Sequence, residues 1–252
     1  MPPGRIILII WVLYALLFTL ALLRKPPQGR RRARVSLGKD APLRLLIIGA
    51  TGGTGRQLVE QALSQGHEVT AFVRNPAKFS LQHPKLRIVQ GDVLVPASLE
   101  PAMQGQDGVL SALGHKKFLG PTRILSEGTA NILRAMKNAR VQRFICESSL
   151  GIGSTAGRGG VFATLFVYPI ILPFYSWDKL RQEKLIEESD LDWVIVRPAA
   201  LTNSAARGQY RHGPKAGSYF LPVRISRADV AAFMLQQLSD DRFLGSAVGL
   251  CY

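Results

Sequence analysis

The sequence predicts an α/β fold, a doubly wound parallel sheet in a single domain, with a transmembrane helix before it. Three observations predict it: an uncharged apolar stretch at 6–23, alternating strand-like and helix-like segments from residue 43, and a glycine-rich loop at the first strand–helix junction. The chain has 252 residues, 47% of them hydrophobic, which is enough for one sizeable core. We therefore expect an anchor at 1–23, a basic linker at 24–42 and a folded domain at 43–252.

The apolar stretch at 6–23, "IILIIWVLYALLFTLALL", is long enough to cross a bilayer. Its 18 residues carry no charge, and a helix of this length spans roughly 27 Å. A cleaved signal peptide has a shorter apolar core and a small-residue cleavage site, whereas this stretch ends in "RKPPQGRRRAR". A buried core helix would be apolar on one face only. We expect an uncleaved single-pass anchor.

Positive charge gathers just after this stretch. The net charge is +15, and residues 24–44 contribute +7 of it through eight basic residues and one aspartate. Basic flanks stay in the cytoplasm, which predicts a domain on the cytoplasmic side. The arginine run could bind nucleic acid. Attraction to anionic lipid is a simpler account, and a solvated topology signal without a partner is the simplest. If residues 6–34 have a partner, we expect it to be membrane lipid. Nucleic acid is not expected, and the oligomeric state is open.

The folded part alternates strands with helices. Strands are predicted at 43–49, 67–74, 85–92, 106–113, 141–149 and 191–198, and 246–252 can add another. Helices are predicted at 55–66, 121–139, 176–189 and 225–238. Gly66 is a suitable C-terminal cap of the first helix, and Ser226 can cap the last one at its N-terminus. The two cysteines, Cys146 and Cys251, are too few for a disulfide framework or a zinc site, so no metal is predicted.

The loop "GATGGTG" at 49–55 has the spacing of a dinucleotide-binding loop of Rossmann type. Gly49 permits a tight turn, Gly52 lets backbone approach a diphosphate, and Gly55 allows the helix to pack closely on the strand. Hydroxyls of Thr51 and Thr54 could add hydrogen bonds. A plain turn is the alternative, but the position at the first strand–helix junction favours a coenzyme. Arg56 and Gln57 stand where a kinase-type phosphate loop needs Lys and Ser/Thr.

The end of the second strand indicates which coenzyme binds. An acidic residue there would hold a ribose 2′-hydroxyl, but the strand ends in Arg74, with Lys78 nearby. A guanidinium can pair with the 2′-phosphate of NADP(H), so NADP(H) is expected rather than NAD(H). If Arg74 is only a solvated charge, the choice stays open.

Several motifs resemble the atypical short-chain dehydrogenase/reductases, in particular NmrA-like NAD(P)-binding proteins and the biliverdin reductase B/flavin reductase group. They are "GATGGTG", "VRNPAK", "GDV", "SEGTANILRAMKNARVQRFICESS", "ESDLDWVIVRPA" and "ISRADVAAFML", and the likeness covers residues 43–252. The resemblance implies a coenzyme site with a diphosphate loop, a 2′-phosphate ligand, an adenine pocket and a segment beside the nicotinamide ribose. In that order, the implied residues are Gly49, Thr51, Gly52, Gly53, Thr54 and Gly55; Arg74; Asp92 and Val93; and Leu113 and Gly114.

Many relatives use a Ser/Tyr/Lys set for catalysis, and the resemblance implies one here. Ser148 and Ser149 end the fifth strand, and "YSWDK" supplies Tyr175 and Lys179 four residues apart, on one face if the segment is helical. The alternative is that Tyr175 packs in the core or precedes the helix, and that Lys179 is a surface lysine paired with Glu183.

The expected function is that of a membrane-anchored NADPH-dependent reductase that transfers hydride to a carbonyl or conjugated acceptor, which could be a lipophilic small molecule. The apolar insertion at 161–174, with two prolines, is too short to span a membrane and could hold a lipophilic substrate, touch the bilayer or pack as a lid. His115 could face the substrate or be a solvated loop group. The alternative function is a non-catalytic NADP(H)-binding sensor or assembly factor at the membrane.

Overall fold

The computed structural model describes residues 3–27, 37–38, 41–115, 117–118 and 120–252. The arginines at 30–34, through which lipid contact was expected, lie outside the described residues. The end of the basic segment closest to the helix is described, and Arg24 there donates hydrogen bonds to the Glu187 carboxylate and the Leu180 carbonyl. This part of the predicted linker therefore lies against the domain.

One large sheet forms the centre of the domain, with strand order β3-β2-β1-β4-β5-β6-β10-β8. The strands are β1 Arg44–Ile48, β2 Glu68–Val73, β3 Leu86–Gln90, β4 Gly108–Ser111, β5 Arg143–Glu147, β6 Asp192–Pro198, β8 Arg211–Gly213 and β10 Ser246–Cys251. All neighbours are parallel except β10 and β8. Every predicted strand is present, and the segment at 246–252 forms β10.

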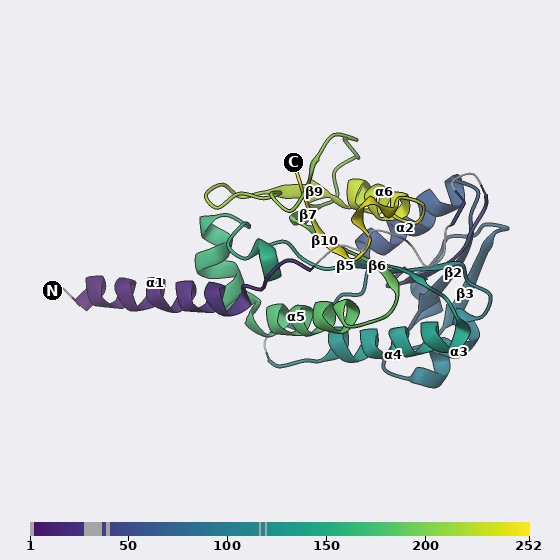
Figure 1. The fold of residues 1–252 in the computed structure, drawn as a ribbon, viewed down its shortest axis with the longest axis horizontal. Coiled ribbons are helices and arrows are strands. Elements are labelled where there is room, and N and C mark those ends of the chain that lie inside the picture. The colour runs from purple at the N-terminus through teal and green to yellow at the C-terminus, as the bar shows by residue number, and fades with distance from the viewer. Residues whose placement is uncertain (1–2, 28–36, 39–40, 116, 119) are drawn as a thin grey trace.

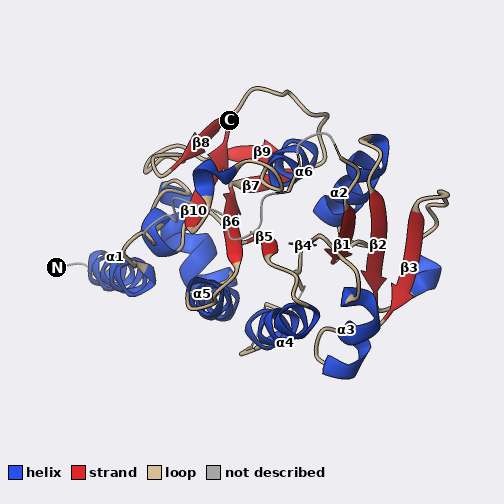
Figure 2. Ribbon diagram, turned by 45° about the vertical axis from the view of Figure 1, so that its right-hand side comes forward, coloured by secondary structure: helices blue, strands red, loops and turns tan. Residues whose placement is uncertain are grey.

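Helices cover both faces of this sheet (Figures 1 and 2). On one face lie α2 Gly53–Ser64 and α6 Arg227–Gln236, and on the other α3 Pro96–Met103, α4 Ile124–Ala139 and α5 Pro173–Glu187. The doubly wound prediction is confirmed. Helix α3 was not predicted, because it is short and contains an internal proline, Pro101. The Ser226 side chain caps α6 by accepting from the Asp229 amide, as expected.

The core has two halves, one on each face of the sheet, and side chains of β1 alternate between them. Leu45 and Ile47 pack with α2 and α6, whereas Leu46 and Ile48 pack on the other face. This alternation is the period of two that a strand imposes. Because both faces are buried, β1 reads as a continuous apolar run.

Smaller elements lie between the main strands and helices. A second sheet pairs β7 Ala200–Thr202 with β9 Arg224–Ser226. Short 3-10 turns lie at η1 Pro76–Lys78, η2 Gly153–Thr155 and η4 Asp241–Phe243. The apolar insertion forms a nine-residue π-helix, η3 Ala163–Ile171, which is too short to cross a membrane, as predicted. A π-helix of this length is rare and often marks a functional segment.

The N-terminal helix α1, Pro3–Leu22, projects from one end of the domain (Figure 1). It is long and apolar enough to cross a membrane, by length and composition. Its first turns are exposed all round, but from Trp11 onward one stripe, Trp11, Ala15, Phe18 and Leu22, turns towards the protein. The helix is therefore apolar on every side, yet half of its length also packs on its own domain.

Candidate functional site

The predicted coenzyme residues lie at the carboxyl edge of the sheet. Gly49 follows β1, Arg74 follows β2, Asp92 follows β3 and Leu113 follows β4. Strand order reverses between β1 and β4, which places a switch point beside the glycine loop. In open α/β sheets ligands bind outside the carboxyl ends of the strands at such a point.

The glycine loop is shaped by contacts between backbone atoms. Gly49 has a φ of +79°, and a Cβ there would lie 2.5 Å from the Ala112 carbonyl oxygen. A Cβ on Gly55 would overlap the Gly49 carbonyl, so α2 could not approach β1 as it does. Gly52 is the N-cap residue of α2 and provides no side-chain cap. Gly52 therefore leaves the first backbone amides of α2 without a side-chain cap. Amides without such a cap can bind an anion at the helix N-terminus.

A basic side chain that the sequence reasoning missed lies over this loop. A Cβ on Gly53 would be 2.5 Å from both Cδ and Nε of Arg227, which stands at the start of α6. Its Nη1 donates to Asn203 Oδ1 at 2.7 Å, which fixes the direction of the guanidinium. Arg227 belongs to the "ISRADV" motif, but only the folded chain brings it to residue 53, so spacing alone could not reveal it.

The two loop threonines differ. Thr51 is exposed. Thr54 is buried, and its hydroxyl donates to Glu147 Oε1 at 3.0 Å. Glu147 ends β5, and burial raises the pKa of its carboxyl, an effect opposed by Lys179, by the Thr54 hydrogen bond and by Arg227. Thr54 thus links the coenzyme loop to the centre of the sheet.

The residues expected around the adenosine part lie on the β2–β3 side. Arg74 is exposed at the end of β2, and its carbonyl accepts from Gln90 Nε2 at 3.4 Å. Val93 is buried beside Gly128, where a Cβ would meet its Cγ2 at 2.7 Å. Asp92 accepts from the Leu94 amide. This arrangement leaves the Arg74 side chain free to meet a ligand from solvent.

Tyr175 and Lys179 both belong to α5 and face the turn after β4. A Cβ on Gly114 would lie 3.9 Å from the Tyr175 hydroxyl, and Lys179 Nζ lies 5.8 Å from the Tyr175 ring centre. Lys179 is only 1% exposed, so the surface-lysine alternative does not hold. Its ammonium donates to the carbonyls of Leu113 and Glu147 and to Gln182 Oε1, at 3.4, 2.9 and 2.9 Å. These bonds tie α5 to the ends of β4 and β5.

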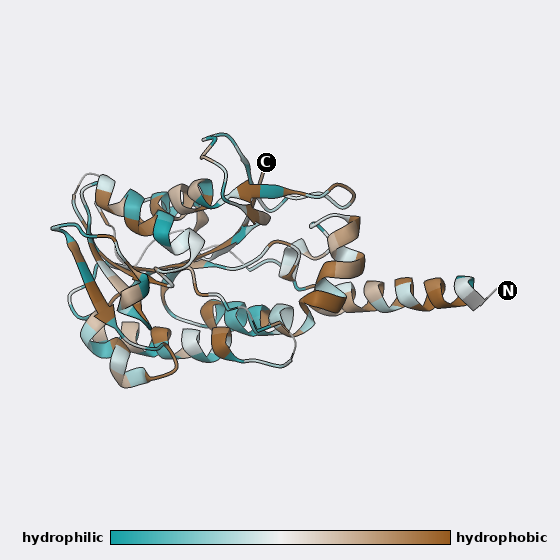
Figure 3. Ribbon diagram, turned by 180° about the vertical axis from the view of Figure 1, so that it is seen from behind, coloured by the Kyte–Doolittle hydropathy of each residue, from teal (hydrophilic) through white to brown (hydrophobic). Residues whose placement is uncertain are grey.

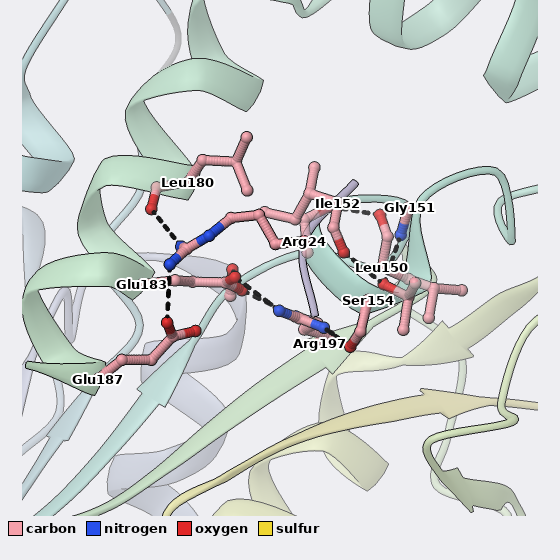
Figure 4. A network of polar contacts seen from close by, with 12 residues as sticks. Arg24, Leu150, Gly151, Ile152, Ser154, Leu180, Glu183, Glu187 and Arg197 are labelled. Carbon is pink, nitrogen blue, oxygen red and sulfur yellow. Dashed lines mark hydrogen bonds and ion pairs between the residues drawn. The ribbon is translucent and has the colours of Figure 1, made fainter. Parts of the chain in front are cut away.

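The two serines point elsewhere. Ser148 Oγ donates to Glu183 Oε1 at 2.6 Å, and Glu183 also pairs with Arg197, from β6, at 2.7 Å. Arg197 reaches Ser154 as well (Figure 4). Ser149 Oγ donates to the carbonyl of Leu150. Ser148 thus joins a buried polar cluster beneath the site, and the structure does not bring either serine hydroxyl into contact with Tyr175.

His115 is placed beside Tyr175 by the loop after β4. The two ring centres are 5.1 Å apart, and Phe118 lies 5.9 Å from the Tyr175 ring. His115 Nε2 lies 3.0 Å from the Thr122 hydroxyl, which contacts Asp178. Burial lowers the pKa of His115, with Asp178 opposing the shift. The neutral form of the His115 imidazole is therefore favoured. His115 and Phe118 form a small aromatic cluster around Tyr175, which the spacing of these residues in the sequence did not reveal.

Comparison with known proteins shows the family to which the chain belongs. The NAD(P)H-binding family matches residues 49–241. An uncharacterised chloroplastic protein of Arabidopsis thaliana is 30% identical over 203 residues, 77% of this chain and 71% of the relative. The photosystem II assembly factor Ycf39 of Synechocystis is 30% identical over 171 residues, 67% of this chain and 48% of the relative, so the chain matches about half of that protein.

A solved short-chain dehydrogenase/reductase of Veillonella parvula, in complex with NADP, has the same fold. Its TM-score is 0.68 at 20% identity, and the match covers 83% of this chain and 94% of that one. The chain belongs to the NAD(P)H-binding family of atypical, NmrA-like short-chain dehydrogenase/reductases.

Proposed function

We propose that this protein is a membrane-attached, NADP(H)-dependent reductase of a carbonyl or conjugated acceptor. The observation that carries the proposal is the position of the Tyr175 hydroxyl, beside Gly114 and within the same helix face as Lys179. A phenol at the switch point, next to the strand end where the coenzyme's reactive end is expected, is a suitable general acid.

The described residues fit a dinucleotide coenzyme. The N-terminus of α2 offers amides for the diphosphate, and the Arg227 guanidinium over Gly53 adds a fixed positive charge. Exposed Arg74 would take the 2′-phosphate. The NADP-bound structure of the Veillonella parvula protein, which has the same fold, supports the choice of NADP(H).

The chemistry divides between coenzyme and protein. A bound NADPH would supply the hydride to the acceptor carbon and would be oxidised in doing so. The part of this chain would be the proton, which the Tyr175 hydroxyl would give to the acceptor oxygen. Lys179 acts as a positioning residue, because its ammonium holds α5 against the carbonyls of Leu113 and Glu147. Tyr175 is reprotonated from solvent, since it is half-exposed.

Coenzyme choice and chemistry can be tested separately with the full chain in detergent. Coenzyme fluorescence should show binding of NADPH that is tighter than that of NADH. Arg74→Met should lower the affinity for NADPH by about tenfold and leave the affinity for NADH unchanged, because only NADPH carries the 2′-phosphate. Tyr175→Phe should retain NADPH binding and lose about a hundredfold in turnover on a quinone, aldehyde and flavin panel. Undiminished turnover would remove Tyr175 as the acid.

Membrane attachment through α1, with the domain on the cytoplasmic side, is part of the same proposal. It is supported by the length and composition of α1 and by the basic segment after it. Flotation of the full chain with lipid vesicles tests attachment. Protease access from the cytoplasmic face tests orientation.

A second function, NADP(H) binding without catalysis in a membrane sensor or assembly factor, has its own support. One relative is named an assembly factor, and the Ser148 hydroxyl and the Lys179 ammonium are both hydrogen-bonded within the protein, to Glu183 and to Gln182. Tight NADPH binding without oxidation on any acceptor of the panel would favour this function.

A further inference from the structure

The second half of helix α1 packs on the domain. The ring of Trp11 stacks on Phe166 of η3 at 6.0 Å, and the Tyr14 hydroxyl donates to the Pro169 carbonyl at 3.2 Å. Phe18 meets Trp177 of α5 edge-on at 6.1 Å. The last turn of the helix is followed by the Arg24–Glu187 ion pair. If α1 enters a membrane, these contacts bring η3 towards the same membrane.

Two apolar protrusions lie at the end of the domain from which α1 projects (Figure 1). The first is η3 with its flanks, and the second is the tip at 219–221, between β8 and β9. The tip contacts the residues just before η3, because the Val161 amide donates to the Phe220 carbonyl and the Leu221 carbonyl lies against Gly160. Figure 1 shows the helical segment of η3 next to α1, and Figure 3 shows brown turns in both segments, alternating with paler turns in α1. The exposed apolar residues of the two protrusions are Val161, Phe162, Phe166, Ile170, Ile171, Phe174, Tyr219, Phe220 and Leu221.

The exposure of this surface is unusual for a face in water. Phe220 is 79% exposed and Leu221 69%. Single exposed apolar residues are ordinary, but a contiguous set of large ones marks an interaction surface. Its continuity with α1, the membrane-length helix, identifies the occupant as the acyl region of a lipid bilayer.

Charge near the protrusions agrees with a lipid surface. Residues 148–177, which include the first protrusion, contain one basic residue and no acidic residue, and residues 207–224, which include the tip, contain four basic residues and no acidic residue. Arg158 stacks over the Tyr219 ring at 4.9 Å and donates to the Lys215 carbonyl. Cations beside inserted aromatic rings can reach anionic headgroups while their stems cover apolar surface.

We propose that residues 161–174 and 219–221 form a lipid-facing surface that enters the headgroup–acyl boundary beside α1. The domain is then held at the membrane by three elements instead of one tether. Helix α5 continues directly from η3, with Tyr175 in its first turn. The entrance to the proposed acceptor site therefore adjoins the bilayer, which suits a lipophilic acceptor that partitions from it. This inference rests on the membrane attachment proposed above.

Depth-dependent quenching tests the surface in the full chain. Single cysteines replace Phe220 or Ile171 and carry an environment-sensitive fluorophore, since native Cys146 and Cys251 are buried. Gln82→Cys is the control, in the exposed segment before β3, at the end of the molecule opposite α1 (Figure 1). In vesicles of phosphatidylcholine and phosphatidylglycerol, labels at 220 and 171 should be quenched several-fold more than the control by nitroxide near the top of the acyl chains, and protected from iodide.

Each other result overturns the proposal. If the protein floats with the vesicles but iodide quenches the labels at 220 and 171, attachment through α1 would be supported. The lipid-facing surface would be contradicted. Labels shielded from both quenchers, with energy transfer between copies, would assign the surface to a second copy of the chain. Failure to float would remove membrane attachment itself. Unchanged thermal unfolding of the labelled variants shows that the exposed substitutions leave the fold intact.

Discussion

The loop after β1 and the cluster beneath β5 are built from different parts of the chain. Backbone atoms fix the glycine loop, where Gly49 lies against the Ala112 carbonyl and Gly55 lies against the carbonyl of Gly49. Side chains fix the cluster, where Ser148 directly follows β5, Glu183 belongs to α5 and Arg197 belongs to β6. The first region depends on the absence of a Cβ atom at each glycine. The second depends on charged side chains that contact one another only in the folded state.

The largest effect is expected in the side-chain region, from Arg197→Met. It leaves the Glu183 carboxylate buried without its cation, which should lower the free energy of unfolding by about 3–5 kcal/mol. Urea denaturation in detergent measures it. Lys184→Met is the matched control, because its pair with Glu188 in the same helix is exposed and should cost less than about 0.5 kcal/mol. Adding Glu183→Gln to Arg197→Met should recover part of the loss. Equal effects of the two single variants would contradict a buried, coupled cluster.

The backbone region is probed by Gly49→Ala. A positive φ and the close Ala112 carbonyl both oppose a Cβ, so we expect a loss of about 3 kcal/mol and impaired coenzyme binding. Gly66→Ala is the matched control: its φ is +86°, but no atom lies within 4 Å of the added Cβ. It should cost about 1 kcal/mol and leave coenzyme binding unchanged. Comparable losses in both variants would show that φ alone, and not the contact with Ala112, shapes the loop.

This difference explains which parts the sequence could predict. Strands, main helices and the glycine loop follow from local period and spacing, so β1 to β6 and α2 were predictable. Arg227 over Gly53 and the Ser148–Glu183 bond join residues 174 and 35 positions apart, and no local pattern encodes them. Helix α5 begins at Pro173, three residues before the predicted start, because Pro suits the first turn of a helix. That start puts Tyr175 and Lys179 on one helix.

Arg227→Met probes the point where a side chain completes the backbone site. Loss of the guanidinium over Gly53 should lower the affinities for NADPH and NADH alike by about tenfold, since both coenzymes carry the diphosphate. Arg224→Met removes an equal charge three residues earlier from an exposed position and should leave both affinities within about twofold. Titration of coenzyme fluorescence measures them. A lower affinity for NADPH alone would show that Arg227 contacts the 2′-phosphate and not the diphosphate.

The smallest effect is expected at Glu147, which links the two regions through Thr54. Burial raises the pKa of its carboxyl above the ordinary 4.5 in the folded state. Below pH 4.5 both states are protonated and the contribution of Glu147 to stability is fully present. As pH rises through the raised pKa, the native carboxyl must ionise in a buried place, and that contribution is lost. Glu147→Gln keeps an acceptor for Thr54 and cannot ionise, so its stability relative to the unsubstituted protein should improve as pH rises from 4.5 towards 8. Urea denaturation across this range measures the difference, with exposed Glu60→Gln as control. A difference that stays constant with pH would mean that Glu147 is solvated and that the link between loop and cluster is open to water.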